Sequence, residues 1–290
     1  MTRRERAERR LGYLLLAPAL VGLAALTVYP ALSVLWLSLE QRVPIFGIDR
    51  FVGLDNYRFL ATDARFWNAA RVTLVFTAVS VGLELFFGTV AALALRAQRV
   101  AVRLAVSLLL LPWALPSVVT AKIFEWLYHP AAGLVNVALG GRDINWLGDP
   151  GLALGGLVIA DVWRTMPFVT LLCYARLLTI PGELYEAAQV DGAGRLATFG
   201  YVTLPMLRQV LLIALLFRTL EALRAVDLMF VLTGGGPAAT TETLTVYAYR
   251  SLFQILHLGL GSAVGVTVFA AVMLVAWAYL RLLRREGLTA

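Results

Sequence analysis

Long apolar stretches separated by short polar connections run through the chain of 290 residues. A helix that crosses the hydrocarbon core of a membrane needs about 20 predominantly apolar residues. Six stretches reach or approach that length: Leu11–Leu39, Asn68–Leu95, Leu104–Tyr128, Leu152–Leu178, Leu207–Leu232 and Leu260–Leu283. The pattern predicts an all-α integral membrane protein with six transmembrane helices. Since no repeat or linker interrupts the series, we expect one transmembrane domain over residues 1–290.

The composition supports this class, and the arginines indicate an orientation. The chain is 60% hydrophobic and only 15% charged, which lies outside the usual balance of a soluble domain. The flanks that contain both chain ends and the connection after the fourth stretch carry fourteen arginines, including Arg99, whereas the opposite flanks carry seven. Because cytoplasmic flanks retain an excess of Arg and Lys, we expect both termini in the cytoplasm. The net charge of +7 then reflects topology and anionic lipid rather than nucleic acid.

One polar connection, Glu183–Pro205, has the features of a docking surface. Pro181 suits the start of a helix, and Gly192 or Gly194 can end that helix in a left-handed conformation. A second helix would then run to the end of the connection. The small pair Ala187–Ala188 would let another backbone approach closely. The alternative is an ordinary amphipathic helix and turn.

Charged side chains cluster inside two of the predicted spans. Asp161 and Arg164 lie three residues apart in the fourth. The fifth carries a charge at every third position: Arg218, Glu221, Arg224 and Asp227. A charge at mid-bilayer costs about 2.5–3.5 kcal/mol, so it normally faces a cavity or an opposite charge. Two interpretations stay open: the charges line a pathway, or Arg164–Asp161 and Arg218–Glu221 simply neutralise one another.

Helical geometry divides these charges between faces. Three-residue steps drift around a helix, so Arg218 and Asp227 should point to nearly opposite sides and not line one pathway together. Arg218 should share a face with Glu221 and Ala222, with Ala225 one turn on. In the fourth span, Thr165 and Phe168 should share a face with Arg164. Three further charges are assigned to helix packing or span ends: Glu84, Lys122 and Glu125.

The polar connection also resembles a known family. Its residues Glu186-Ala187-Ala188, Asp191-Gly192-Ala193, Phe199 and Leu204-Pro205 resemble the EAA loop of ABC importer permeases. The resemblance implies that residues 181–207 form a cytoplasmic coupling loop seated in a cleft of a separate ATPase. The residues that it assigns to coupling are Glu183, Glu186, Ala187, Ala188, Asp191, Gly192 and Ala193.

Three other segments are similar to the carbohydrate branch of that family, which includes maltose, trehalose and glycerol-phosphate permeases. They are FVGLDNY at Phe51–Tyr57, DVWRTMPF at Asp161–Phe168 and VLTGGGP at Val231–Pro237. This similarity implies sugar contacts at Asp161, Arg164, Thr165, Phe168, Arg218, Glu221, Ala222 and Ala225. The chain departs from the maltose permease pattern by placing charges where that permease has neutral residues.

The resemblance implies a six-span permease subunit of type I ABC importer architecture in a bacterial or archaeal-type cell membrane. Such a subunit would move a sugar, such as the disaccharide trehalose or maltose, by alternating access. Its expected partners are a second permease, two ATP-binding subunits and an extracytoplasmic sugar-binding protein. The chain has no G-x-x-x-x-G-K-[ST] loop. We therefore expect a non-catalytic subunit without a cofactor, with ATP and Mg bound by the partner ATPase.

Two other classes of function compete with this one. An ion-coupled secondary transporter would use Asp161, Glu221 and Asp227 to relay protons across the membrane. A membrane-embedded enzyme would need a nucleophile with a base, or a metal site. The sequence offers no convincing set of that kind, since His129 and His257 lie far apart without companion ligands.

Overall fold

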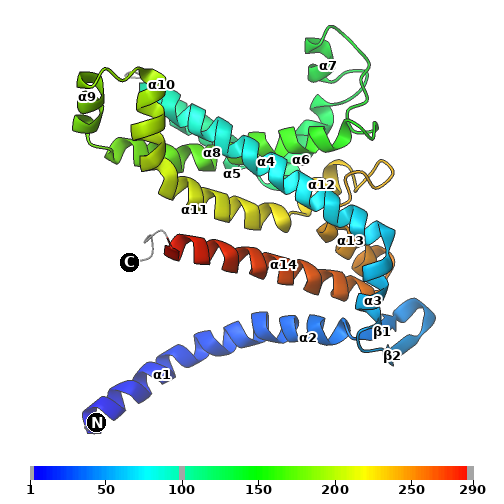
Figure 1. Cartoon of the computed structure of the whole chain (residues 1–290). Coiled ribbons are helices and arrows are strands. Elements are labelled where there is room, and N and C mark those ends of the chain that lie inside the picture. The colour runs from blue at the N-terminus through cyan, green and yellow to red at the C-terminus, as the bar shows by residue number, and fades with distance from the viewer. Residues whose placement is uncertain (1–2, 98–101, 286–290) are drawn as a thin grey trace. The chain divides into compact units, whose positions relative to one another are not determined.

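The computed structural model describes residues 3–97 and 102–285. Arg99 lies outside the described residues, as do the ends, 1–2 and 286–290, of the domain predicted over the whole chain. The described part is almost entirely helical, with one two-stranded sheet (Figure 1). It forms two compact units, Met1–Asp63 with Ala248–Thr267, and Ala64–Tyr247 with Val268–Ala290.

The first unit contains the first predicted span as one continuous helical stretch. It consists of α1 (Arg3–Leu23), a π-helical turn (Ala24–Val28) and α2 (Tyr29–Leu37). The helical segment Gly12–Leu37 is long and apolar enough to cross a membrane, and none of its residues is buried. An apolar surface of this size suits lipid or another subunit.

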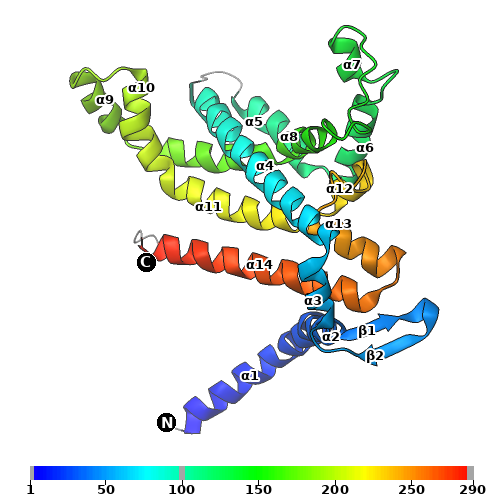
Figure 2. The ribbon, with the colours of Figure 1, turned by 45° about the vertical axis from the view of Figure 1, so that its right-hand side comes forward.

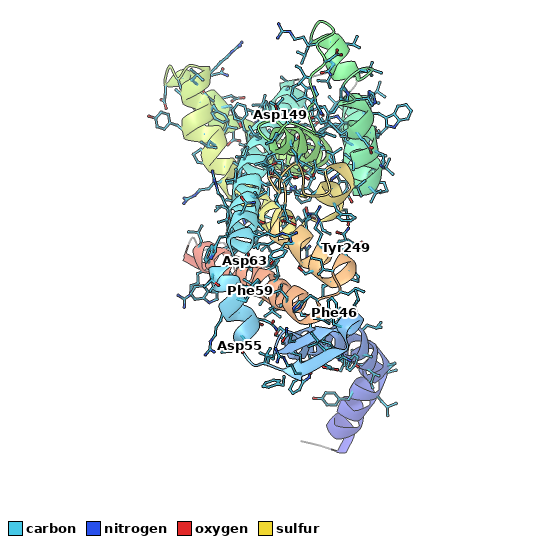
Figure 3. All side chains as sticks on the ribbon, turned by 90° about the vertical axis from the view of Figure 1, so that its right-hand side faces the viewer. Phe46, Asp55, Phe59, Asp63, Asp149 and Tyr249 are labelled. Carbon is cyan, nitrogen blue, oxygen red and sulfur yellow. The ribbon has the colours of Figure 1, made fainter. Side chains whose placement is uncertain are left out.

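A β-hairpin follows this helix. Strands β1 (Glu40–Val43) and β2 (Ile48–Phe51) pair antiparallel around a short 3₁₀ turn (Pro44–Phe46). Gly47 closes the turn at a φ of 62°, which glycine adopts without strain. Helix α3 (Asp55–Thr62) follows the hairpin. Figure 3 labels Phe46 in the turn and Phe59 in α3.

The second unit is built around three helices that contact one another: α4 (Ala64–Ala97), α8 (Ala153–Thr179) and α11 (Leu204–Leu223). At Gly88 of α4 an added Cβ would lie 2.8 Å from the Cβ of Val169, so the glycine permits the close approach of α4 and α8. Helices α5 (Val102–Ala114) and α6 (Ser117–Leu127) contact α8 as well.

The remaining helical elements are short, except for α14. They are α7 (Leu134–Ala138), α9 (Gly182–Val190), α10 (Arg195–Thr198), a π-helical turn (Phe199–Thr203), α12 (Asp227–Leu232), α13 (Leu244–Tyr249), a second π-helical turn (Arg250–Gln254) and α14 (Leu258–Arg285). Both ribbon views show α9 and α10 together near the start of α11 (Figure 2).

The third predicted span is broken. Helices α5 and α6 are bent by 96° to one another at Leu115–Pro116. Pro116 is extended, with φ −58° and ψ 142°, and a proline has no N–H to continue the helical hydrogen bonding. Pro112 and Pro116 were the available sequence signal for this break.

The fifth predicted span has the wrong limits at both ends. The apolar helix begins at Arg195 and ends at Leu223, so the predicted second helix of the polar connection continues into the span. At the other end the chain leaves the helix before Asp227. The Ala225 carbonyl accepts a hydrogen bond from the Thr245 hydroxyl at 2.6 Å, which satisfies a backbone group that a continuous helix would have used.

The count of spans agrees with the prediction. Among the described residues, five helices are long and apolar enough to cross a membrane, and there are six if the bent pair α5–α6 is one span. The structure is therefore that of an all-α, multi-pass membrane protein.

Candidate functional site

A buried ion pair joins two of the spanning helices in the second unit. Arg218 of α11 is only 2% exposed, and Glu84 of α4 is fully buried. The Arg218 Nε donates to Glu84 Oε2 at 2.6 Å, and Nη2 donates to Oε1 at 3.0 Å. This bidentate arrangement is the strong form of an Arg–carboxylate contact. Glu84 thus lies in the helix packing, as predicted, but the sequence did not identify its partner.

Asp161 of α8 extends this pair into a cluster. One of its oxygens accepts from Arg218 Nη2 at 3.3 Å, and the other accepts from Arg164 Nη2 at 3.3 Å. Arg218 Nη1 also donates to Glu221. We call Glu84, Asp161, Arg164, Arg218 and Glu221 the charge cluster. The predicted pairs Arg164–Asp161 and Arg218–Glu221 both form within it.

A polar cavity of about 280 Å³ opens beside the charge cluster. Its lining includes six of the eight residues predicted to contact substrate: Asp161, Arg164, Arg218, Glu221, Ala222 and Ala225. Thr165 and Phe168 are not part of the lining of this cavity. The Thr165 hydroxyl is buried and donates to the Asp161 carbonyl at 2.6 Å. The Phe168 ring stacks on Trp113 of α5, with 6.0 Å between centroids.

Asp227 lines the same cavity as Arg218, which corrects the prediction that the two lie on opposite sides. That prediction assumed a continuous helix, whereas the chain breaks between them. Asp227 begins α12 and accepts a hydrogen bond from Ser117 of α6 at 3.1 Å. The two helix breaks, near Pro116 and Ala225, therefore both border the cavity. Ser117 was not identified from the sequence, although it follows a proline that marks the first break.

Exposure changes from the base of the cavity to its rim. Arg218 and Asp161 are buried at the base, whereas the Glu221 side chain is 55% exposed and Arg224 and Asp227 are exposed. The buried Nε of Arg164 has no hydrogen-bond partner among the described residues. The lining thus offers carboxylate acceptors and guanidinium donors, the groups that bind hydroxyls through charge-assisted hydrogen bonds.

The predicted coupling segment forms a helix and a glycine turn. Helix α9 ends at Val190, and Gly192 closes it with a φ of 77°. Gly194 has a φ of −71°, so Gly192 alone takes the left-handed role. Five of the predicted coupling residues are exposed: Glu183, Glu186, Ala187, Asp191 and Gly192. Ala188 and Ala193 are half-buried.

Tyr185 attaches α9 to the spanning helices. Its hydroxyl accepts from Arg96 Nη1 at 2.5 Å and lies 3.3 Å from the Thr203 hydroxyl. The Arg96 guanidinium also lies 4.3 Å from the centroid of the Tyr185 ring, a cation–π distance. Arg96 lies in the last turn of α4, and Thr203 ends the π-helical turn before α11. The sequence did not identify Tyr185 as an anchor, since its partner is 89 positions away.

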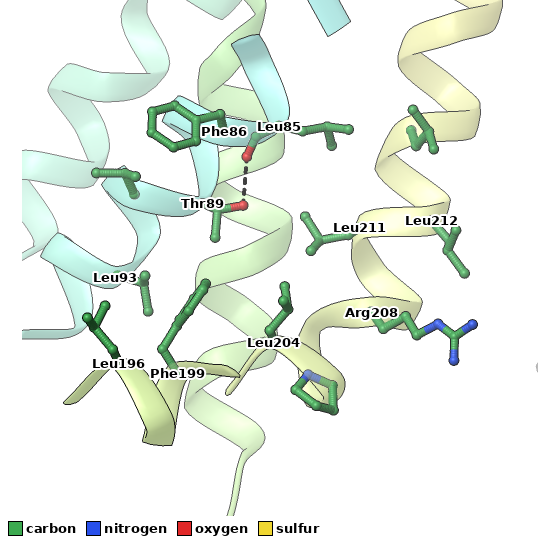
Figure 4. A pocket seen from close by; sticks show the side chains of 13 residues that line it. Leu85, Phe86, Thr89, Leu93, Leu196, Phe199, Leu204, Arg208, Leu211 and Leu212 are labelled. Atoms are coloured by element: carbon green, nitrogen blue, oxygen red, sulfur yellow. Dashed lines mark hydrogen bonds between the residues drawn. The ribbon is translucent and has the colours of Figure 1, made fainter. Parts of the chain in front are cut away.

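The second half of the segment borders an apolar groove of about 900 Å³. Phe199, Leu204 and Pro205, all residues of the predicted motif, line the groove together with residues of α4 and α11. Figure 4 shows Phe199 between Leu93 and Leu204. Leu204 and Pro205 are the first residues of α11, so the motif continues directly into a spanning helix.

The chain matches a known family. The model of the family described as "Binding-protein-dependent transport system inner membrane component" matches residues 84–287, more than half of the chain. The chain therefore belongs to this family, the permease components of ABC importers, and is a multi-pass protein of the cell membrane. This confirms the predicted class and favours it over the ion-coupled secondary transporter.

Individual relatives cover nearly the whole chain. The trehalose/maltose transport system permease protein of Thermococcus litoralis is 39% identical, over 94% of this chain and 94% of its own length. The sulfoquinovosyl glycerol transport system permease protein of Agrobacterium fabrum is 38% identical, over 96% and 92%. A crystal structure of a bacterial ABC transporter involved in the import of the acidic polysaccharide alginate contains a chain with a TM-score of 0.84. It is 20% identical, with 97% of this chain and 98% of that chain covered. Its fold confirms the predicted architecture.

Proposed function

We propose that this permease subunit moves a sugar across the membrane, in particular a disaccharide such as trehalose or maltose. The observation that carries the proposal is the polar cavity, where donors and acceptors from two spanning helices converge beside two helix breaks. The trehalose/maltose permease relative supports the same class of cargo. Ligand pockets usually have volumes of about 300–1,000 Å³. The cavity of about 280 Å³ would hold one part of the sugar, and the second permease would complete the pocket.

Within the cavity, Arg164 and Glu221 are the proposed direct ligands. The Arg164 Nε is a buried donor without a partner in the described residues, and a sugar hydroxyl would satisfy it. Glu221 is the most exposed carboxylate of the charge cluster and would accept from a hydroxyl. Asp161 and Arg218 form the base, and Ala222 and Ala225 leave room for the sugar. Thr165 and Phe168 would hold α8 in position rather than contact the sugar.

We propose that α9 couples the cavity to ATP hydrolysis in a separate subunit. Its exposed Glu183, Glu186 and Asp191 would contact the ATPase, and the small Ala187–Ala188 pair would let it seat closely. Tyr185 would pass a displacement of α9 to α4 and to the helix that continues into α11. This role requires residues 181–207 and both chain ends on the cytoplasmic side.

The full importer would contain a second permease, two ATP-binding subunits and an extracytoplasmic sugar-binding protein. ATP and Mg would be bound by the ATP-binding subunits, and this chain would need no cofactor. The loop after α12 is a candidate surface for the binding protein. The fully buried Glu242 holds this loop by accepting hydrogen bonds from Arg65 at 2.8 and 2.6 Å, and Asn68 donates to the Ala239 carbonyl at 2.9 Å. Such a fixed loop would offer a preorganised contact.

The proposal is tested by a panel of sugars presented to the reconstituted importer in proteoliposomes. Uptake of labelled trehalose or maltose should exceed that of monosaccharides and amino acids. Uptake of an amino acid with no uptake of any sugar would overturn the assignment.

A further inference from the structure

We infer that Glu84 determines the charge class of the cargo: by holding Arg218, it suits the polar cavity to a neutral sugar rather than an anionic one. The inference rests on the proposed function and specifies the substrate class of the same site. Membership of the family does not decide this point. The structurally similar transporter described above is involved in importing an acidic polysaccharide.

Arg218 is already occupied by protein carboxylates. An arginine in a small, partly dehydrated cavity is a strong ligand for carboxylate, sulfonate or phosphate. All three nitrogens of Arg218 already donate to protein carboxylates. Nε and Nη2 donate to Glu84, Nη2 also to Asp161, and Nη1 to Glu221. Glu84 lies behind the cavity lining and is fully buried, so a ligand in the cavity competes poorly for the Arg218 edge that Glu84 occupies.

The charged groups around the cavity have an excess of carboxylates. Four carboxylates (Glu84, Asp161, Glu221 and Asp227) face the three arginines of the lining. The described groups therefore carry one negative charge more than positive ones. An anionic sugar would meet this excess at short range, where charges interact strongly. An uncharged sugar needs only hydrogen bonds, which Glu221 and the Arg164 Nε can supply.

The removal of the Glu84 charge should abolish this preference. In Glu84→Gln the Arg218 guanidinium loses its bidentate counter-ion and the cavity gains one positive charge, while the size of the side chain is kept. Glu84→Asp keeps the charge and is the conservative variant. Glu125→Gln is the matched control, because it makes the same change at a carboxylate that pairs with Lys122 on α6 and is not part of the cavity lining.

The experiment uses the complete importer, purified in nanodiscs without its binding protein. A labelled neutral disaccharide, trehalose or maltose, is displaced by the unlabelled sugar or by its 6-phosphate ester. For wild type, Glu84→Asp and Glu125→Gln, the phosphate ester should displace the label about tenfold less well than the neutral sugar. Glu84→Gln should reduce this difference by about tenfold. A second change, Arg218→Gln in the Glu84→Gln chain, should abolish the gain in affinity for the ester.

The outcomes separate this inference from the proposed function. Equal displacement by both compounds in wild type overturns the inference, as does an assembled Glu84→Gln importer with the wild-type ratio. If Glu84→Gln does not assemble, wild type and Glu84→Asp test the inference instead. The neutral sugar must displace the label better than the phosphate ester in both, and loss of this preference in either one overturns the inference. If wild type neither binds a neutral disaccharide nor takes one up with ATP, the proposed function itself has failed.

Discussion

The Nε of Arg218 lies 2.6 Å from Glu84 Oε2, and this contact joins α11 to α4 across 134 positions of the chain. Both side chains are buried. Burial makes each charge costly unless the other is present. The pair therefore fixes α11, which lines the polar cavity, against α4 behind it.

Breaking this pair from one side should be more harmful than removing it whole. Arg218→Met leaves Glu84 buried without its main counter-ion and should cost about 3–5 kcal/mol of stability. The double variant Glu84→Leu/Arg218→Met should recover a large part of that loss, because apolar replacements of a buried pair are often tolerated. Thermal unfolding of the purified importer measures both. A double variant less stable than Arg218→Met would contradict the pairing.

The contact between Tyr185 and Arg96 should matter for coupling. Tyr185→Phe keeps the ring over the guanidinium but removes the hydroxyl that accepts from Arg96, a loss of about 0.5–1.5 kcal/mol. Transport per ATP hydrolysed should fall severalfold while the subunits stay assembled. Tyr201→Phe is the control, since Tyr201 is 86% exposed. Unchanged transport per ATP in Tyr185→Phe would show that the anchor is dispensable.

The turn after α9 should tolerate change at one glycine and not at the other. Gly192→Val places a β-branched residue at a φ of 77°, which costs about 1–2 kcal/mol and should displace the coupling surface. Gly194→Ala changes a glycine at a φ of −71° with nothing near the added Cβ. Co-purification of the ATPase should weaken only for Gly192→Val. Equal association of the two variants would count against the docking role of α9.

The break between α11 and α12 should depend on Thr245. Thr245→Val keeps the shape of the side chain but leaves the Ala225 carbonyl without the hydroxyl, at a cost of about 1–3 kcal/mol. Thr267→Val is the matched control, because the Thr267 hydroxyl donates to a carbonyl one helical turn earlier in the same helix, that of Ala263. We expect a lower unfolding temperature and weaker sugar binding for Thr245→Val. If Thr267→Val has an equal effect, the hydrogen bond to Ala225 does not maintain the break.

The spans could be predicted because hydropathy and length follow directly from the thickness of a membrane. The interruptions within them could not be predicted by the same measure. Pro116 signalled one break, whereas Arg224–Val226 contains neither Gly nor Pro. At that second break the Ala225 carbonyl is satisfied by a hydroxyl 20 positions later in the chain, which hydropathy does not register.

The candidate site was predicted in part for a related reason. Six of the eight expected substrate residues line one cavity, since Asp161, Arg164, Arg218 and Glu221 are charges that must be satisfied inside the membrane. The placement of Asp227 was wrong because a helical face was extended across a break. The partners of Tyr185 and Glu84 were not identified because they lie in other helices, a tertiary relationship that spacing along one helix does not contain.

If a separate ATPase drives this permease through α9, sugar crosses the membrane only when that ATPase hydrolyses ATP. The most direct test is uptake of the labelled disaccharide by proteoliposomes that contain the complete importer, with ATP, without ATP, and with a proton uncoupler. Uptake should require ATP and the ATPase subunits and should be unaffected by the uncoupler. Uptake that persists without the ATPase subunits and collapses with the uncoupler would contradict this mechanism.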